Sequence, residues 1–575
     1  MKKLVSMLLA MLMLTGMAAG VSAETFTGED TGIGPISVTL TVEDGKITAA
    51  EVVGDGETPG FGYEPIHDGV YAAAIVEKQG ADIDVIANAT VTSNAVIAAT
   101  KKAMIAAGLM EAENVTVQDE TCDLVIVGAG GAGMTAAQDK NEWKDATTAA
   151  VEKTIAGAKE KYGDKLGDLI ATVEAQFEAY KANPVGYFDS PELFALDTMV
   201  GGKAINNLDL VMTLVNNSAD AIDWLATKDA NLVSVGSFGG ASVMRIHRAL
   251  TAEGKTTPVG AYLVKTLTAA VEGCDQIDLR INSAATELVV TDGKVSGVKV
   301  SSDNGDYTIT AKAVILASGG FGADLERVAA LKPELKGFVT TNSAGITGDG
   351  IDMATAVGAA TVDMDQIQIH PSVYTETSAL ITEGIRGDGA ILVNQGGKRF
   401  VNELETRDVV SAAELAQEGG YAWTIVDQKM MDASSTYNGY FTKGFALKGE
   451  TIDELAAAMG TDAATLTETL NTWNAAVAAQ KDDEFGRMSF AKALDTAPYY
   501  AIKVAPGIHH TMGGIVINTS AEVLDEAGNA IPGLYAAGEV TGGVHGANRL
   551  GGNAVADIVV FGRIAAQSAA AAIAE

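Results

Sequence analysis

Residues 123–137, DLVIVGAGGAGMTAA, constrain the fold more than any other stretch, because a short apolar run leads directly into glycines. Gly128, Gly130 and Gly133 fit the pattern G-x-G-x-x-G. The first glycine allows a tight turn, the second lets a pyrophosphate approach the backbone, and the third lets a helix pack closely on the strand. The helix N-terminal amides then bind the phosphates. The segment predicts the start of a dinucleotide-binding α/β domain, with a plain strand–turn–helix unit as the alternative.

The composition indicates a glycine-rich α/β protein with several domains. The chain has 575 residues, of which 47% are apolar and 64 are glycines, and this length exceeds one ordinary domain. Its formal net charge of −35 argues against nucleic acid or an anionic membrane surface as a partner.

The cysteines limit the redox chemistry that the chain can support. Cys122 and Cys274 are the only two, and neither lies in a C-x-x-C-H motif, so no covalent c-type haem is expected. Two cysteines cannot supply the four thiolates of an ordinary iron–sulfur cluster, and no metal site is predicted. Electrons are therefore expected to arrive through flavin or from an external donor.

The N-terminus has the pattern of a secretory signal peptide over residues 1–23. Lys2 and Lys3 precede an apolar run, and the segment ends in the small residues Val-Ser-Ala. We expect cleavage there and a secreted, cell-surface or periplasmic protein, with an uncleaved anchor as the alternative. No later apolar run is expected to span a bilayer.

A small α+β domain is predicted over residues 26–108. Val38, Leu40 and Val42 alternate as in a half-buried strand, and Asp44-Gly45 is a hairpin turn before a return strand. The rest of this domain has the pattern of a helix, a loop and a second helix.

The loop of this domain reads DVIANAT from Asp84 onward. It resembles the covalent FMN-attachment motif of secreted FMN-binding domains, D-x-x-(S/T)-G-A-(T/S), although residues 87–88 are Ala-Asn instead of Ser/Thr-Gly. The resemblance implies that a flavin transferase esterifies Thr90 to the FMN phosphate and that Asp84 is the motif acid. The alternative is a polar loop in which Ser93 or Asn94 caps the next helix.

Residues 505–557 carry the densest site chemistry in the chain. They contain paired histidines, an apolar run, a glycine-rich turn with one acid, and a lone arginine in a Gly/Asn loop. This stretch resembles the C-terminal signature of the fumarate reductase/flavocytochrome c flavoprotein family, including urocanate-reductase-like members. That family uses FAD to reduce the C=C bond of unsaturated carboxylates.

The resemblance also assigns roles to individual residues, because residues 366–414 are similar to the substrate and proton-delivery segment of the family. It implies that Arg407 is the proton donor and that Glu383 and Arg386 form a proton relay. The residues expected to hold substrate carboxylates are His370, Thr382, His509 and Arg549, with His510 as a neighbour of His509. Those expected to contact FAD are Glu539, at the ribityl or ribose region, and Leu550, Asn553 and Ala554, against the isoalloxazine ring.

Each assignment has a plainer alternative, since any one histidine could be structural and Glu383 with Arg386 could be a simple helical ion pair. Taken together, the residue types suit the chemistry. A dianionic substrate needs charge-assisted donors, and a guanidinium can bind a carboxylate through two parallel bonds. Flavin N5 delivers hydride to one carbon and an acid protonates the other. Because arginine is almost always protonated in proteins, the acid role of Arg407 is implied by the resemblance alone.

The first half of the predicted flavin site departs from the expected pattern. A dinucleotide fold needs a second strand whose end carries an acid about 20 residues after the glycines. Residues 138–182 instead have apolar residues at helical spacing: Ile155, Leu166, Leu169, Ile170, Val173 and Phe177. We infer that some tens of residues are missing near 137/138. A genuine variant with a rebuilt adenosine site is the alternative.

These patterns predict an α/β protein with a Rossmann-like FAD-binding domain, an inserted α+β capping domain, and a preceding small α+β FMN-binding domain. Residues 184–228 predict helices, residues 286–321 predict a strand meander, and a glycine-rich loop at 345–350 precedes a helix. The expected domains are a signal peptide (1–23), an FMN-binding domain (26–108), the first part of the FAD-binding domain (120–364), a capping and substrate domain (365–509), and the second part of the FAD-binding domain (510–575).

The expected function is secreted, flavin-dependent reduction of the C=C bond of a small unsaturated carboxylate, fumarate- or urocanate-like, in anaerobic respiration. Hydride would come from N5 of FAD and a proton from Arg407, while the FMN domain would pass on electrons from an external donor. Retention of His370 and Thr382 favours a fumarate-like dicarboxylate. The alternative is an FMN-only electron carrier or an inactive remnant, if the gap abolishes FAD binding.

Overall fold

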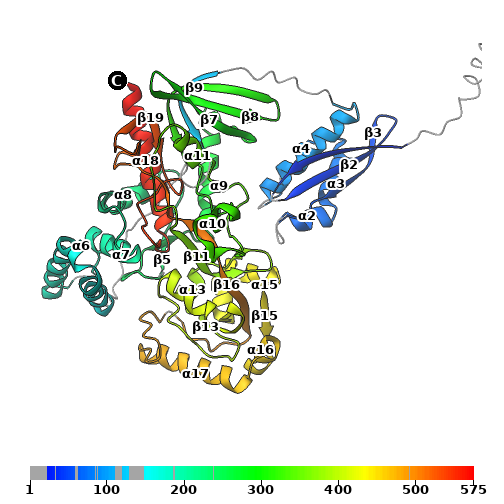
Figure 1. Cartoon of the computed structure of the whole chain (residues 1–575). Coiled ribbons are helices and arrows are strands. Elements are labelled where there is room, and N and C mark those ends of the chain that lie inside the picture. Colours follow the sequence, from blue (N-terminus) through cyan, green and yellow to red (C-terminus); the bar gives the residue numbers. More distant parts are fainter. Residues whose placement is uncertain are drawn as a thin grey trace, which may run out of the picture. The chain divides into compact units, whose positions relative to one another are not determined.

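The computed structural model describes residues 23–575 except positions 33, 58–61, 85, 87–88, 111–119, 128–147, 185–187, 237–238, 491 and 575. The chain divides into two compact units, Met1–Thr116 and Val117–Glu575 (Figure 1). The signal peptide predicted at the N-terminus and the three glycines of the G-x-G-x-x-G pattern lie outside the described residues, apart from Ala23. The fold class is confirmed as mixed α/β.

The first unit is a three-stranded antiparallel sheet covered by helices. The strands are β1 (Glu24–Thr31), β2 (Pro35–Glu43) and β3 (Lys46–Val53), in that order. Asp44 and Gly45 both have positive φ, 48° and 72°, as the two-residue turn between right-twisted strands requires. The predicted hairpin is therefore confirmed, whereas β1 was not predicted. The helices are α2 (Tyr63–His67), α3 (Val70–Lys78) and α4 (Thr90–Ala106).

Helix α4 packs directly on the sheet of this unit. A Cβ on Gly28 of β1 would overlap the carbonyl oxygen of Ala99, so only glycine permits this approach of helix to strand. The helix begins at Thr90 after Ala89, and the proposed capping role of Ser93 or Asn94 is therefore wrong. Ser93 lies inside the first turn, where its hydroxyl donates to Ala89 O and accepts from the amide of Ile86.

The central sheet of the second unit has the order β18-β19-β9-β8-β7, and β4 also pairs with β9. The predicted meander is confirmed as β7 (Ser283–Thr291), β8 (Lys294–Ser302) and β9 (Gly305–Leu316). Strands β4 (Glu120–Val127) and β19 (Ala530–Ala536) run parallel to β9, with Val127 and Ala536 both level with Leu316. The carboxyl ends of three parallel strands therefore meet at one edge.

Strand β4 has an open side in the part of the chain that the structure describes. It pairs with β9, and its Ile126 is 49% exposed. Strands of a parallel sheet are ordinarily covered on both faces. If a strand that follows β4 has been lost near 137/138, β4 would be left exposed in this way. The deletion itself stays a prediction, because residues 128–147 are outside the described part.

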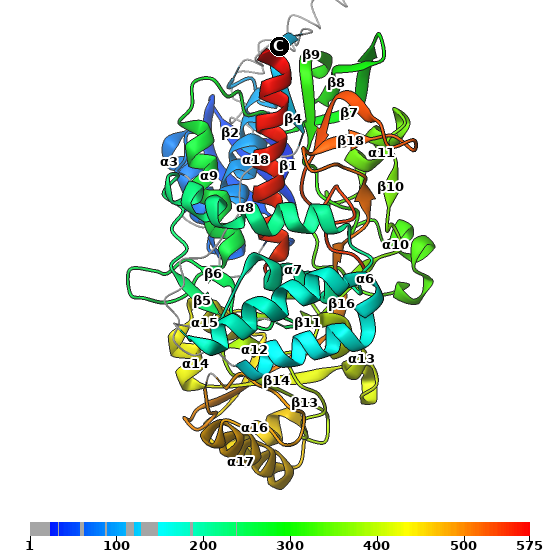
Figure 2. The ribbon, with the colours of Figure 1, turned by 90° about the vertical axis from the view of Figure 1, so that its left-hand side faces the viewer.

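Three helices cover one side of this unit: α6 (Thr148–Ala182), α7 (Pro191–Gly201) and α8 (Leu208–Ala226). They lie side by side in Figure 2. The helical spacing predicted for residues 138–182 is confirmed over α6, with a kink where Tyr162 and Leu166 leave helical geometry. Their shared core includes Val151, Ile155, Ile170, Val173, Phe177, Phe194, Leu196 and Val211.

A second sheet, ordered β12-β11-β16-β14-β13 with β15 also on β16, has its own core. Its strands are β11 (Ile367–Tyr374), β12 (Ala379–Leu380), β13 (Ile391–Val393), β14 (Ala422–Asp427), β15 (Ala446–Gly449) and β16 (Tyr499–Thr511). Its helices are α12 (Gly384–Gly387), α13 (Arg407–Leu415), α14 (Gln428–Ala433), α15 (Ser435–Thr442), α16 (Ile452–Met459) and α17 (Ala463–Ala479). Strand β16 pairs with β14 over its first residues and with β11 over its last residues. It therefore runs from the core of this second sheet to the core of the central sheet.

The remaining elements complete the second unit. They are β5 (Ser234–Gly236), β6 (Ile246–Arg248), α9 (Val259–Glu272), α10 (Leu325–Leu331), α11 (Asp349–Ala356), β10 (Thr361–Val362), β17 (Gly514–Ile515), β18 (Glu522–Leu524) and α18 (Asn553–Ala574). The helix predicted after the glycine-rich loop at 345–350 is confirmed as α11.

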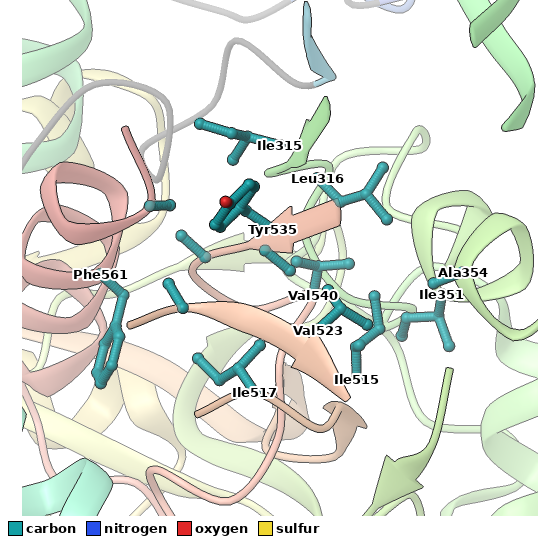
Figure 3. Close-up of a cluster of buried hydrophobic side chains, with 14 of the residues drawn as sticks. Ile315, Leu316, Ile351, Ala354, Ile515, Ile517, Val523, Tyr535, Val540 and Phe561 are labelled. Atoms are coloured by element: carbon teal, nitrogen blue, oxygen red, sulfur yellow. The ribbon is translucent and has the colours of Figure 1, made fainter. Parts of the chain in front are cut away.

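Helix α18 is long and apolar enough to cross a membrane by length and composition, contrary to the expectation that no run after the signal peptide would be. Its Val559, Val560, Phe561 and Ala565 are nevertheless buried in the main core. Figure 3 shows Phe561 among side chains of the strands, including Ile517 and Tyr535. The apolar face of α18 is thus the face that packs on the protein.

Candidate functional site

Two imidazoles face each other where β11 and β16 pair. The ring centroids of His370 and His509 are 4.9 Å apart. The backbone amide of Ser372 donates to Nδ1 of His370 over 3.0 Å, so this nitrogen carries no proton and Nε2 is the donor. Nδ1 of His509 lies 2.7 Å from the hydroxyl of Thr341, a partner that the sequence did not reveal. Burial and the nearby guanidinium of Arg407 lower the pKa of both histidines well below the usual range.

The structure gives His510 other neighbours than His509, at a point where the register of β16 against β11 shifts between Gln368 and Ile369. His510 is buried, with Nδ1 3.5 Å from Glu539 and its ring 5.5 Å from that of His545. Nε2 of His545 in turn lies 3.2 Å from the carboxylate of Asp557. His509 therefore faces the predicted substrate residues, while His510 belongs to a second row that leads to α18.

Arg407, Glu383 and Arg386 form one buried, hydrogen-bonded group. Nε of Arg407 donates to Oε2 of Glu383 over 2.9 Å, and Nη2 donates to the same oxygen. Nη2 of Arg386 lies 3.6 Å from Oε1 of Glu383. All three residues are buried, so the pair at i,i+3 is no exposed helical ion pair of the ordinary kind.

Gln368 connects this group to the C-terminal loop, and sequence reasoning missed it. Its Oε1 accepts from Nη1 of Arg407 over 2.9 Å, and its Nε2 donates to Asn548 Oδ1 and Arg549 O over 2.6 and 2.7 Å. Gln368 lies two residues before His370 on β11, and residues i and i+2 of a strand share a face. That spacing was the signal that could have identified it.

The charge balance of the site favours a bound anion. Burial alone would raise the pKa of Glu383, but the guanidiniums of Arg407 and Arg386 outweigh it and lower the pKa to about 2. Burial and the charge of Arg407 lower the pKa of Arg549 to about 9. Nε of the buried Arg549 has no hydrogen-bond partner within the described part of the chain. A buried cation with an unsatisfied donor is a receptor for a carboxylate.

Thr382 immediately precedes Glu383 and helps to place it. The amide of Thr382 donates to the hydroxyl of Tyr440 over 2.9 Å, and the amide of Gly384 contacts its Oγ1 at 3.4 Å. Burial raises the pKa of Tyr440 to about 12, so this phenol remains neutral. These contacts place Thr382 just before the start of α12, beside the group formed by Arg407, Glu383 and Arg386.

The carboxyl ends of β4, β9 and β19 offer a setting that fits a dinucleotide cofactor. Glycine-rich segments follow β9 and β19, with Gly319 and Gly538 at φ of 80° and 81°. The segment that follows β4 begins the G-x-G-x-x-G pattern. Ligands of open α/β sheets bind at this end of the strands. The buried hydroxyl of Ser318, two residues after β9, has no hydrogen-bond partner among the residues that the structure describes. The described residues therefore fit FAD on this side of the site.

Of the other residues predicted to contact FAD, Leu550 and Asn553 are buried, whereas Glu539 and Ala554 are partly buried. Glu539 accepts from the amide and hydroxyl of Thr511 over 2.8 and 3.2 Å, and burial raises its pKa. Leu550 packs closely against Gly201 of α7, and the side-chain Nδ2 of Asn553 donates to the hydroxyl of Thr198 over 3.0 Å. Ala554, next in α18, is half-buried.

The predicted FMN-attachment residues lie in the first unit. Thr90 is the first residue of α4 and Asp84 is exposed. Between them, Ala87 and Asn88 lie outside the described residues. The hydroxyl of Thr92 donates to the buried carboxylate of Glu57, which ties the start of α4 to the loop after β3.

Two family models match the chain. The FAD binding domain model matches residues 123–555, and the FMN-binding domain model matches residues 32–105. The chain is 45% identical to a fumarate reductase (cytochrome) of Shewanella frigidimarina over 455 residues, which cover 78% of this chain and 77% of that protein. It is 35% identical to a urocanate reductase of Eggerthella lenta over 587 residues, which cover 96% and 93% of the two chains.

The fold is also that of a solved relative. The open conformation of a flavocytochrome c3 fumarate reductase matches with a TM-score of 0.58 and 38% identity, over 79% of each chain. A third relative, an NADH:acrylate oxidoreductase of Vibrio harveyi, is 33% identical over 93% of this chain and 60% of its own length.

Proposed function

This chain belongs to the FAD-binding family of fumarate reductase-like flavoenzymes, which act on the C=C bond of unsaturated acids, and we propose that its substrate is a small dicarboxylate of the fumarate class. The observation that carries the proposal is the arrangement of donors around Arg407. Arg549 lies at a buried position with a free donor, and the neutral pair His370 and His509 lies beside it. Such a set suits a substrate with a carboxylate at each end of a short double bond.

In the proposed reaction, different residues bind the substrate and deliver the proton. Bound reduced FAD would supply hydride to one carbon of the double bond. Arg549 and the two imidazoles hold and polarise the carboxylates, while Arg407 holds the proton for the other carbon. Glu383, ionised at neutral pH, orients Arg407 through hydrogen bonds and with Arg386 returns a proton to it. The burial of Arg407 and Glu383 excludes water that would compete for this proton.

The proposal is tested by turnover with chemically reduced viologen as the electron source. Fumarate, urocanate and acrylate would be offered to the purified full-length protein under anaerobic conditions. We expect fumarate to give the highest kcat/KM. Turnover of urocanate without turnover of fumarate would refute the dicarboxylate assignment and leave the reduction of a C=C bond standing.

We further propose that the protein is secreted and carries FMN covalently on Thr90, attached by a flavin transferase. The support is the matched FMN-binding domain and the position of Thr90 at the start of the 17-residue helix α4, where N-terminal amides favour a phosphate. The FMN would pass electrons from an external donor to FAD. Thr90→Ala should abolish the flavin fluorescence of the denatured polypeptide, whereas Thr58→Ala, outside the motif, should retain it.

One observation favours a second function, that of an FMN-only electron carrier. The exposed Ile126 on the open side of β4 is consistent with an FAD fold that lacks a strand. Acid precipitation of the purified protein would release non-covalent FAD and leave FMN on the polypeptide. FAD and FMN at about one each per chain support the reductase, whereas covalent FMN alone supports the carrier.

A further inference from the structure

One face of helix α13 is both buried and polar. The buried residues of this helix are Arg407, Val410, Ser411 and Glu414, at positions i, i+3, i+4 and i+7, which share one face. Arg407 is at the start of the helix and Glu414 lies two turns further, about 10 Å along the axis. The proton donor expected from the sequence and a buried acid thus lie on the same stripe.

Several polar atoms around this stripe have no hydrogen-bond partner among the described residues. They are both carboxyl oxygens of Glu414, the hydroxyl of Ser411, and Nε and Nη2 of Arg386. None of these side chains is exposed. Buried polar atoms are normally paired with protein or ordered water. A group of complementary, unpaired donors and acceptors on α12 and α13 therefore indicates a small polar space that water would bridge.

Glu414 differs from the two buried acids Glu383 and Glu403 in having no bonded cation. Glu383 is bonded to Arg407, and Glu403 accepts from Arg399 and Arg487 over 2.9 and 3.1 Å. Glu414 has no such partner, and burial raises its pKa well above the usual range, with Arg386 opposing that rise. A buried carboxyl without a bonded cation is stable only in its neutral form. Glu414 is thus a proton-bearing acid beside ionised ones, the pattern by which donors are recognised.

We infer that Glu414 is a fourth member of the proton relay and supplies the proton that Arg386 and Glu383 return to Arg407. This inference rests on the proposed function. Per turnover, the substrate gains a hydride from reduced flavin and one proton from Arg407. Arg407 regains its proton through Glu383 and Arg386, and Glu414 becomes a carboxylate. Glu414 then takes one proton from solvent near the end of α13, where Leu415 is exposed.

Arg386 interacts electrostatically with both acids, Glu383 at the start of α12 and Glu414 on α13, and also with Arg407 and Glu403. Its Nη1 donates to the backbone oxygen of Glu403. Burial lowers the pKa of Arg386, which makes its guanidinium a better proton donor than an exposed one. The order along the path is Glu414, Arg386, Glu383 and Arg407.

The test compares Glu414→Gln, which keeps the shape and removes the proton, with the matched exposed control Glu418→Gln. The first readout is the infrared absorption of protonated carboxyl groups in the purified, substrate-free protein. We expect a band in the wild type and in the control that is missing in Glu414→Gln. Retention of the whole band in Glu414→Gln would overturn the inference, whichever substrate the enzyme uses.

The second readout is the pH profile of fumarate reduction. In Glu414→Gln we expect kcat to fall about tenfold at pH 7 with KM unchanged, and to recover as the pH is lowered, because bulk protons must then reach Arg386 directly. Glu414→Asp should restore part of the rate. A pH profile identical to that of the wild type would overturn the inference. Inactivity of the wild type on fumarate would refute the proposed substrate, and the infrared comparison would still decide the state of Glu414.

Discussion

Replacing Arg407 by alanine tests the proposed site most directly. The change removes the guanidinium that donates to Glu383 and to Gln368. Loss of a positioned general acid costs about 100-fold or more in kcat. Arg549, His370 and His509 remain, so KM should change little. Flavin content should also be unchanged, because the guanidinium of Arg407 bonds to Glu383 and Gln368, and neither is expected to hold the cofactor.

The same substitution has a stability effect that follows from the pKa of Glu383. In the folded protein this pKa is about 2, against an ordinary value of 4.5, and the difference corresponds to about 3 kcal/mol. Because the folded pKa is the lower one, this stabilisation is complete well above pH 4.5 and is lost as the pH falls toward 2. About 1 kcal/mol should be lost by pH 4 and about 2 kcal/mol by pH 3.

In Arg407→Ala, Glu383 loses its bonded guanidinium and keeps Arg386, at 3.6 Å, and Arg549 as nearby cations, so the pKa of Glu383 should rise. The unfolding free energy at pH 7 should fall by about 3 kcal/mol, and its decrease between pH 7 and pH 4 should become smaller. Urea unfolding at both pH values measures this, with Arg280→Ala, which removes an exposed ion pair, as the control. Loss of flavin together with activity would show that Arg407 is structural and would refute the reasoning.

Three other changes have clear expected outcomes. Arg549→Met should raise KM for fumarate about 10- to 100-fold by removing a charge-assisted bond. In the wild type, KM should rise above pH 9, because Arg549, with its pKa of about 9, then loses its charge. A flat KM between pH 7 and 10 would contradict this role. Gly28→Ala should destabilise the first unit by about 1–3 kcal/mol, because the added methyl overlaps Ala99 of α4; urea unfolding followed by circular dichroism measures it. Gly157→Ala, inside α6 with no atom in the way, should instead stabilise the protein by about 0.5–1 kcal/mol, and a lower unfolding midpoint would show that the glycine serves packing.

Short sequence patterns correctly predicted several turns, strands and helices that depend on residues close in sequence. The Asp44-Gly45 turn, the meander of β7 to β9 and the helical spacing of α6 all depend on residues close in sequence, and the structure has them. The start of α4 was misjudged because Ser93 is a good capping residue by type, whereas its hydroxyl instead bonds to Ala89 and Tyr71. Strand β1 was missed because its polar sequence, ETFTGEDT, shows little alternation, and it forms by pairing with β2.

The sequence alone shows which residue types are available for the chemistry, because they lie in short continuous motifs. These motifs surround His370, Glu383, Arg407 and Arg549. Tertiary structure decided how they act. Only the pairing of β11 with β16 brings His370 to His509, and only burial gives Glu383 and Arg549 their shifted pKa values. Glu414 carries no motif at all. Its significance comes from its burial and from the lack of a hydrogen-bonded cation among the described residues, and desolvation depends on the whole fold and not on neighbours in sequence.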